Sequence, residues 1–267
     1  MLKDITLGQY FPGNTPIHRL DPRTKLIWVV LYIVALFSAQ WLLTYGLVLG
    51  LLIAVVALSK IQFKVILKSM KPLLFIILLT GLLNLFYTQG TPLVSFWIFT
   101  ITREGIFSAV FMVLRISMLI TGTFMLTYTT SPIALTDGLE RLLGPLKKIK
   151  VPVHELTMMM CIALRFIPTL IEETDKIISA QKARGADFET GSIFSRAKAL
   201  IPILVPLFIS SFRRADELAV AMECRCYHGG EGRTRLKELS YRRVDYIVLI
   251  GGLLFVAGII VLANLGL

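Results

Sequence analysis

The segments D-K-I-I-S-A-Q-K-A-R-G (residues 175–185) and D-E-L-A-V-A-M-E-C-R-C (residues 216–226) share aspartate, alanine and arginine at identical spacing. In both segments the arginine stands nine residues after the aspartate. Apolar residues recur three and four positions apart in the sequence leading into each segment, which is typical of an amphipathic helix. Three identities in a short window also arise by chance in a sequence of biased composition. The interpretation we favour is two similar helices, each ending in an exposed arginine.

A proline lies upstream of each arginine, Pro168 in R-F-I-P and Pro206 in V-P-L-F. Each predicted helix has one apolar face. The first face comprises Leu156, Met160, Ala163, Ile167, Leu170 and Ile177, and the second comprises Leu204, Phe208, Phe212, Ala215, Ala219 and Met222.

The composition of the whole chain is that of an integral membrane protein. Of its 267 residues 55% are hydrophobic, and the mean hydropathy is +0.75. Several apolar runs approach the roughly 20 residues that cross a bilayer as a helix. Residues 1–25 contain proline, glycine and charged residues rather than an unbroken apolar core, so we expect no cleavable signal peptide.

The net charge of +11 is concentrated in one part of the sequence. Residues 131–243 carry 18 of the 28 lysines and arginines and 13 of the 17 aspartates and glutamates, which predicts a solvated domain. In a membrane protein, an excess of basic residues indicates loops that face the cytoplasm and anionic lipid. No recognition motif accompanies the charge, and we therefore expect no nucleic-acid partner.

The predicted fold is an all-α integral membrane protein with about five transmembrane helices. Residues 25–59 are expected to form two spans that turn near residues 38–41, and the other spans are predicted at residues 72–87, 105–128 and 244–262. The predicted domains are residues 1–130 (an N-terminal lead and four spans), 131–243 (a cytoplasmic coupling domain of amphipathic helices) and 244–267 (the last span). The distribution of positive charge places the N-terminus inside and the C-terminus outside.

Two basic features lie at or within the predicted spans. Lys60, Lys64, Lys68 and Lys71 share one helical face, which suits either anionic headgroups or simple solvation. Arg115 falls in the middle of the fourth span, where an unpaired charge costs at least about 3 kcal/mol. A functional role would be a contact with a partner subunit or a polar seam against the soluble domain. A structural role would be snorkelling or an internal structural bond, and the structural role is the favoured interpretation.

The sequence offers no constellation for catalysis, metal binding or nucleotide binding. His154-Glu155 begins like a zinc-protease motif, but Met158 stands where the second histidine is required. The cysteines Cys161, Cys224 and Cys226 lack the spacing of a zinc site or a disulfide framework and are expected to be reduced thiols. A phosphate-binding loop of the G-x-x-x-x-G-K-[ST] type is missing. We therefore predict a non-catalytic protein without a cofactor.

Three stretches of this sequence resemble the transmembrane (T) component of energy-coupling factor transporters, which are ABC-type importers of vitamins and metal ions. They are A-L-R-F-I-P (residues 163–168), A-Q-K-A-R-G (residues 180–185) and A-M-E-C-R-C-Y (residues 221–227). The resemblance implies a scaffold in a prokaryotic plasma membrane that works with two ATP-binding-cassette ATPase subunits and one membrane S component, which binds the substrate.

The same resemblance implies that each arginine tip docks into one ATPase. The implied docking residues are Ala183, Arg184 and Gly185 at the first tip and Cys224, Arg225 and Cys226 at the second. Arg115, Arg165, Pro168 and Pro206 are structural or partner candidates. The two cysteines replace small residues that are usual at the second tip, which fits a pair of ATPases that are not identical.

Two other functional classes remain open on the sequence alone. A channel or secondary transporter with a cytoplasmic regulatory domain would transport substrate without partners, whereas the scaffold would copurify with two ATPases. A membrane enzyme is less favoured because no catalytic constellation is present. The sequence does not identify the transported vitamin or ion.

Overall fold

The computed structural model describes residues 10–96, 99–186, 188, 192–229 and 239–266. The contacts within the chain define two compact units. The membrane unit consists of Gly8–Gly138 and Leu239–Leu267, and the hairpin unit consists of Leu139–Glu238 together with Met1–Leu7. Trp97, Gly191 and the glycine-rich loop from residue 230, which the sequence placed in loops, lie outside the described residues.

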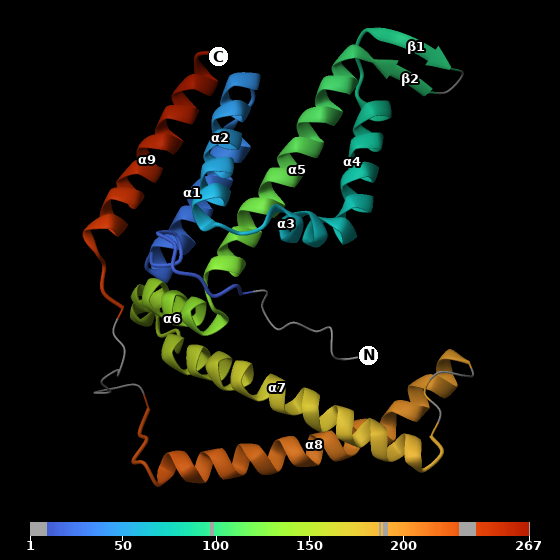
Figure 1. Ribbon diagram of the computed structural model, residues 1–267, viewed down its shortest axis with the longest axis vertical. Coiled ribbons are helices and arrows are strands. Elements are labelled where there is room, and N and C mark those ends of the chain that lie inside the picture. Colours follow the sequence, from blue (N-terminus) through green and yellow to red (C-terminus); the bar gives the residue numbers. More distant parts are fainter. Residues whose placement is uncertain (1–9, 97–98, 187, 189–191, 230–238, 267) are drawn as a thin grey trace. The chain divides into compact units, whose positions relative to one another are not determined.

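The membrane unit is built mainly from helices that pack against α1 or α5. Its elements are α1 (Pro22–Ser38), α2 (Leu42–Ser59), α3 (Phe63–Met70), a 3₁₀ turn (Lys71–Leu73), α4 (Leu74–Tyr87), β1 (Pro92–Phe96), β2 (Phe99–Thr102), α5 (Arg103–Thr129) and α9 (Arg243–Asn264). Helix α1 packs against α9 and α5, and α4 packs against α5 (Figure 1). Helix α6 (Pro132–Leu143) carries the chain out of this unit.

Large apolar side chains and close glycine contacts hold these helices together. The core includes Tyr32, Leu36, Val48, Leu52, Met118 and Ile259. Gly122 of α5 lies against the ring of Tyr32, where a Cβ would come within 2.4 Å of a ring carbon. The Tyr32 hydroxyl donates to the Met118 carbonyl at 3.0 Å, so this ring packs on α5 and bonds to it as well.

The predicted helical hairpin within residues 25–59 is confirmed. Helix α1 ends at Ser38 and α2 begins at Leu42, which matches the turn expected near residues 38–41. Asp21 caps the start of α1 by accepting a hydrogen bond from the Arg23 amide at 2.9 Å, and Pro22 occupies the first helical position.

The segment between α4 and α5 contains a β-hairpin. Strands β1 and β2 are antiparallel, with Ser95 opposite Thr100 and Phe96 opposite Phe99. The sequence P-L-V-S-F and F-T-I-T is rich in β-branched and aromatic residues, a composition that favours strands. The expectation of an all-α fold therefore holds for the body of the protein but omitted this hairpin.

Five described stretches are long and apolar enough to cross a bilayer. They are Leu42–Ser59, Phe63–Tyr87, Arg103–Thr129, Val153–Ala183 and Arg243–Asn264. Four of them contain the predicted second to fifth spans. Helix α1, the predicted first span, has 17 residues, which is at the lower end of spanning length. Val153–Ala183 was predicted instead as an amphipathic coupling helix, and it is the least apolar of the five.

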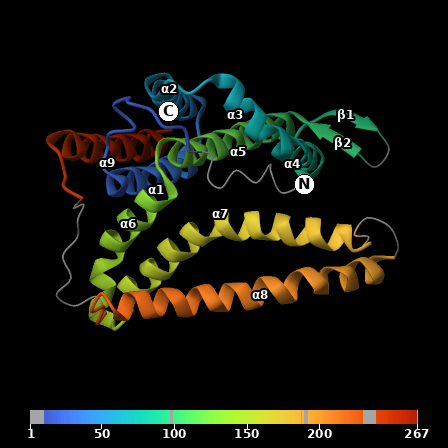
Figure 2. The same ribbon diagram turned by 60° about the horizontal axis from the view of Figure 1, so that its bottom comes forward.

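The hairpin unit is dominated by two helices of 31 residues each, α7 (Val153–Ala183) and α8 (Ile193–Glu223). A 3₁₀ segment (Gly144–Ile149) links α6 to α7, as Gly144-Pro145 suggested. Helices α7 and α8 run antiparallel side by side (Figure 2). The two predicted long helices are thus present, with their ends within one residue of Arg184 and two residues of Arg225.

Candidate functional site: the two arginine tips

The arginine tips lie at opposite ends of the α7–α8 pair. Arg184 follows the last residue of α7, whereas Arg225 follows α8 and lines a cavity with Met158 near the start of α7. Some 26 residues separate Met158 from Arg184, and a helix rises 1.5 Å per residue, so the tips stand roughly 40 Å apart. A single small groove on one partner could not receive both tips.

The two tips have the same backbone geometry. At the first tip the Gly185 amide donates to the Lys182 carbonyl at 3.0 Å, and the Ala186 amide donates to the Gln181 carbonyl at 3.0 Å. At the second tip the corresponding bonds run from Cys226 to Glu223 at 2.8 Å and from Tyr227 to Met222 at 3.1 Å. These pairs of bonds define a Schellman cap at the end of each helix.

Each cap requires one residue in the left-handed conformation. Gly185 has φ of 85° and Cys226 has φ of 56°. Arg184 and Arg225 therefore occupy equivalent positions immediately before the left-handed residue, and both side chains are exposed. The sequence repeat that the two segments suggested is thus a repeat in structure, and Cys226 takes the same place in the second cap as Gly185 in the first.

Prolines within α8 tie that helix to the first tip. A proline lacks an amide hydrogen, so Pro206 leaves the carbonyl of Pro202, four residues earlier, without its helical donor. Gln181 of α7 donates from Nε2 to that carbonyl at 3.4 Å. Pro168 lies inside α7 in the same way. The prolines named as structural candidates thus lie within the two long helices, and Pro206 frees an acceptor that a side chain near Arg184 uses.

An ion pair links the middles of the two long helices. Glu173 of α7 accepts hydrogen bonds from the hydroxyl of Ser210 and from Nη2 of Arg214, the latter at 2.7 Å. This contact joins the helices between the two tips and fixes their register. The sequence analysis did not single out these three residues, although each lies on a predicted helix beside its apolar face.

A cavity at the second tip is lined by another arginine, Arg165. The cavity has a volume of about 570 Å³. Arg165 of α7 and Arg225 line it together with His228, and no acidic side chain is among its described lining residues. The remaining lining residues are Met158, Cys161, Ile162, Leu218, Met222, Cys226, Tyr227 and Gly229. Two arginines that line one cavity form a site suited to a carboxylate.

Cys224 and Cys226 are exposed thiols. Cys161 is partly buried and also carries a thiol. Within the described residues no group of three histidine, cysteine, aspartate or glutamate side chains could hold a metal ion. His154, from the incomplete zinc-protease pattern, instead pairs through Nδ1 with Oε1 of Glu140 at 3.0 Å.

Arg115 makes hydrogen bonds within the membrane unit. Its Nε donates to the Tyr45 hydroxyl at 2.7 Å, and its Nη2 donates to the Ala39 carbonyl at 3.2 Å. Ala39 lies in the turn between α1 and α2, so this arginine fastens that turn to the middle of α5. The charge in the span is satisfied by polar groups of the same unit.

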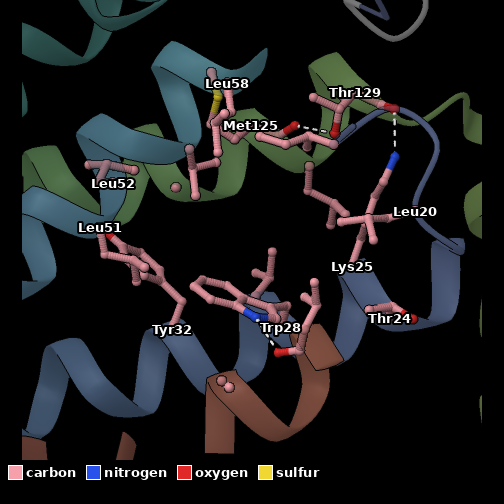
Figure 3. A pocket seen from close by; sticks show the side chains of 18 of the residues that line it. Leu20, Thr24, Lys25, Trp28, Tyr32, Leu51, Leu52, Leu58, Met125 and Thr129 are labelled. Atoms are coloured by element: carbon pink, nitrogen blue, oxygen red, sulfur yellow. Dashed lines mark hydrogen bonds between the residues drawn. The ribbon is translucent and has the colours of Figure 1, made fainter. Parts of the chain in front are cut away.

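The membrane unit also contains an apolar cavity of about 380 Å³ between α1, α2, α5 and α9. Figure 3 shows Trp28 and Tyr32 of α1 facing Leu52 and Met125 across it. Trp28 donates from Nε1 to the Val248 carbonyl of α9 at 3.2 Å. Lys25 is the charged residue at its border, and its ammonium group is held by backbone and hydroxyl oxygens.

Comparison with known proteins agrees with this architecture. Residues 13–236 match the family model for CbiQ, described as a cobalt transport protein. An energy-coupling factor transporter transmembrane protein EcfT of Acidaminococcus fermentans is 56% identical over 99% of this chain and 98% of its own length. Proteins of that name from Clostridium kluyveri and Bacillus subtilis are 54% and 48% identical over 96% and 94% of this chain, and over 96% and 95% of their own lengths. The chain therefore belongs to the CbiQ family, among the EcfT transmembrane components of energy-coupling factor transporters.

Proposed function

We propose that this chain is the energy-coupling scaffold of its transporter and transmits ATP-driven motion from two ATP-binding-cassette ATPases to a substrate-binding S component for vitamin uptake. One observation carries the proposal. Two arginines occupy equivalent cap positions at opposite ends of one helical hairpin, roughly 40 Å apart. Such a pair suits two separate partners, each taking one tip.

The chemistry of each tip fits a protein groove lined by carboxylates or carbonyls. An arginine presents a rigid planar fork of donors, and the small Ala183 beside Arg184 leaves room for close approach. The second tip adds Arg165 beside Arg225 and has thiols where the first has Ala183 and Gly185. Because the two tips differ in charge and shape, the proposed ATPases are not identical.

The proposed orientation places the hairpin unit (Leu139–Glu238), and with it the predicted domain of residues 131–243, in the cytoplasm of a prokaryotic cell. The N-terminus is inside and the C-terminus outside. We assign α7 to the cytoplasm despite its length because its second half carries Glu172, Glu173, Asp175, Lys176 and Lys182. Lys60, Lys64, Lys68 and Lys71, all exposed around α3, are proposed to meet anionic headgroups.

The experiment that tests this function purifies the tagged chain from membranes and identifies the proteins that copurify. We expect two ATPases and a small membrane protein, ATP hydrolysis by the complex, and none by the chain alone above a mock preparation. Arg184→Ala and Arg225→Ala should each reduce ATPase recovery, and the double variant should nearly abolish uptake at normal expression. Substrate transport by the chain alone, or normal uptake by the double variant, would contradict the proposal.

A further inference from the structure

Five consecutive residues, D-P-R-T-K (residues 21–25), connect the start of α1 to segments far away in the sequence. Three of them are buried, with Asp21 7%, Thr24 0% and Lys25 6% exposed, and Pro22 and Arg23 are partly buried. In the structure they contact Gly138, where the chain leaves the membrane unit for α7, and Leu239, where it returns from α8.

The outgoing connection is held by Lys25 and Pro22. Nζ of Lys25 donates to the Thr129 carbonyl at 2.8 Å and to Oγ1 of Thr130 at 3.0 Å, at the end of α5 (Figure 3). Gly138 of α6, the last residue of the membrane unit on this side of the sequence, packs on Pro22, where a Cβ would lie 3.0 Å from the proline Cβ. The chain therefore leaves the unit in contact with the first turn of α1.

The returning connection is held by Arg23. Nη2 of Arg23 donates to the carbonyl of Leu239 at 3.0 Å, and Leu239 is the residue at which the chain re-enters the membrane unit. The guanidinium carbon also lies 3.9 Å from the centre of the Tyr241 ring. The same guanidinium group also donates to Asp21, with Nε and Nη2 each 3.0 Å from a carboxylate oxygen.

A buried aspartate then joins this segment to α9. Asp245 is 1% exposed. Its Oδ1 accepts from the Asp21 amide at 2.9 Å, and its Oδ2 accepts from the Arg242 amide at 2.8 Å. Buried charges that are paired and hydrogen-bonded hold one geometry, because any displacement leaves a charge without its partners.

We propose that these residues form a mechanical junction through which displacement of the hairpin unit reaches α1 and α9 together. The α1 junction comprises residues 21–25, Gly138, Tyr241 and Asp245. The connections that leave the membrane unit at Gly138 and re-enter it at Leu239 both end on it, so a pull on either of these two connections acts directly on the first helix. Arg23 is its central positioning residue, because it holds the return segment by a backbone bond and a ring contact while its ion pair with Asp21 fixes the guanidinium group. This inference rests on the proposed function.

The test measures coupling separately from assembly and folding. The chain is reconstituted in liposomes with the ATPases and S component that copurify with it, and uptake per ATP hydrolysed is compared among variants. Arg23→Gln and Asp245→Asn should assemble and hydrolyse ATP, while uptake per ATP falls between about twofold and thirtyfold. Tyr241→Leu should lower the ratio as well, and the conservative Tyr241→Phe, which keeps the ring, should restore it. Arg19→Gln in the exposed lead is the matched control for loss of an arginine.

The outcomes distinguish failure of the junction proposal from failure of the proposed function. If Arg23→Gln lowers only yield or thermal stability, and the assembled complex keeps the wild-type uptake per ATP, the junction is a structural clamp and the inference is wrong. If the wild-type chain recovers no ATPases, the proposed function fails first. A wild-type complex that transports, together with junction variants that hydrolyse ATP without matching uptake, supports the inference.

Discussion

Gly185 and Cys226 occupy the same position in two Schellman caps, yet only one of them is a residue that tolerates the left-handed conformation without cost. The amides of both donate to the carbonyl three residues earlier. A side chain with a Cβ pays about 1 kcal/mol or more there, because the Cβ crowds the carbonyl oxygen. Replacing Cys226 by glycine and replacing Gly185 by alanine should therefore have opposite effects on the stability of the two caps.

Cys226→Gly should leave the second tip as stable as the wild type or stabilise it by up to about 1 kcal/mol, whereas Gly185→Ala should destabilise the first tip by a similar amount. Hydrogen exchange at the amides of Tyr227 and Ala186, which close the caps, reports these local changes. Faster exchange at Tyr227 in Cys226→Gly would show that the thiol itself holds the cap.

Arg165 and Arg225 should act as a pair in docking, because they line one cavity. In a double-mutant cycle that measures ATPase recovery, Arg165→Ala and Arg225→Ala should be non-additive by about 0.5 kcal/mol or more, while Arg165→Ala and Arg184→Ala should add. Loss of either tip arginine alone is expected to cost about 2 to 5 kcal/mol of binding. Additivity of the first pair would place Arg165 outside the docking site.

Arg115 should be needed for stability rather than for docking. Tyr45→Phe removes the acceptor of Nε and leaves a partly buried guanidinium with one bond fewer, which should cost about 1 to 3 kcal/mol. Thermal unfolding in detergent measures this loss, and uptake per folded complex should stay unchanged. Normal stability with impaired recovery of the S component would instead make Arg115 a partner contact.

The topology can be tested with the native thiols. Cys224 and Cys226 are exposed, so an impermeant maleimide should label them in permeabilised cells but not in intact cells if the hairpin unit is cytoplasmic. In a variant without native cysteines, Gln89→Cys should be labelled in intact cells. Gln89 is preferable to Gly90, because a side chain at Gly90 would collide with Glu104. Labelling of the tip thiols in intact cells would reverse the orientation.

The N-terminal lead should lose structure in mild acid. His18 accepts a hydrogen bond at Nδ1 from Thr15 and donates from Nε2 to the Phe11 carbonyl, at 2.6 and 3.0 Å, which suits a neutral ring. Burial lowers the pKa of His18, and the charge of Lys25 lowers it further, against an opposing contribution from the Phe11 bond. Because the folded pKa lies below the unfolded value of about 6.5, the stabilisation is complete above that pH and is lost as the pH falls through the folded pKa.

Hydrogen exchange of residues 10–20 between pH 7 and pH 5 tests this expectation. Protection should decrease toward pH 5 in the wild type, and His18→Gln should remove the pH dependence. Exchange that is equally pH-dependent in both proteins would assign the effect to another group.

The sequence alone predicted those elements that are determined by residues close together in the sequence. Apolar periodicity and helix-stop residues located α7 and α8, and the repeated spacing of Asp, Ala and Arg correctly indicated two equivalent tips. Helix boundaries at Ser38 and Leu143 also followed from turn residues. These features depend on neighbours within a turn or two, which a single sequence contains.

The contacts that were missed join residues far apart in the sequence. Nothing near Asp21 indicates that its amide meets Asp245, 224 residues away. The pairing of Arg165 with Arg225 depends on the register of two helices, which the bonds between Glu173 and α8 help to set. A cluster of charges at the border of an apolar span was the available signal for the α1 junction, because such charges need partners there.

The contact of Glu173 with Ser210 and Arg214 fixes the direction of the tip arginines as well as joining α7 to α8. Helix α7 ends ten residues after Glu173. Each helical residue turns the next by about 100° and advances it by 1.5 Å. One residue inserted between Glu173 and Arg184 would hardly change the span between the tips, yet it would turn the first arginine to another side while the second kept its direction. The number of residues between Glu173 and the end of α7 therefore determines the direction in which Arg184 points.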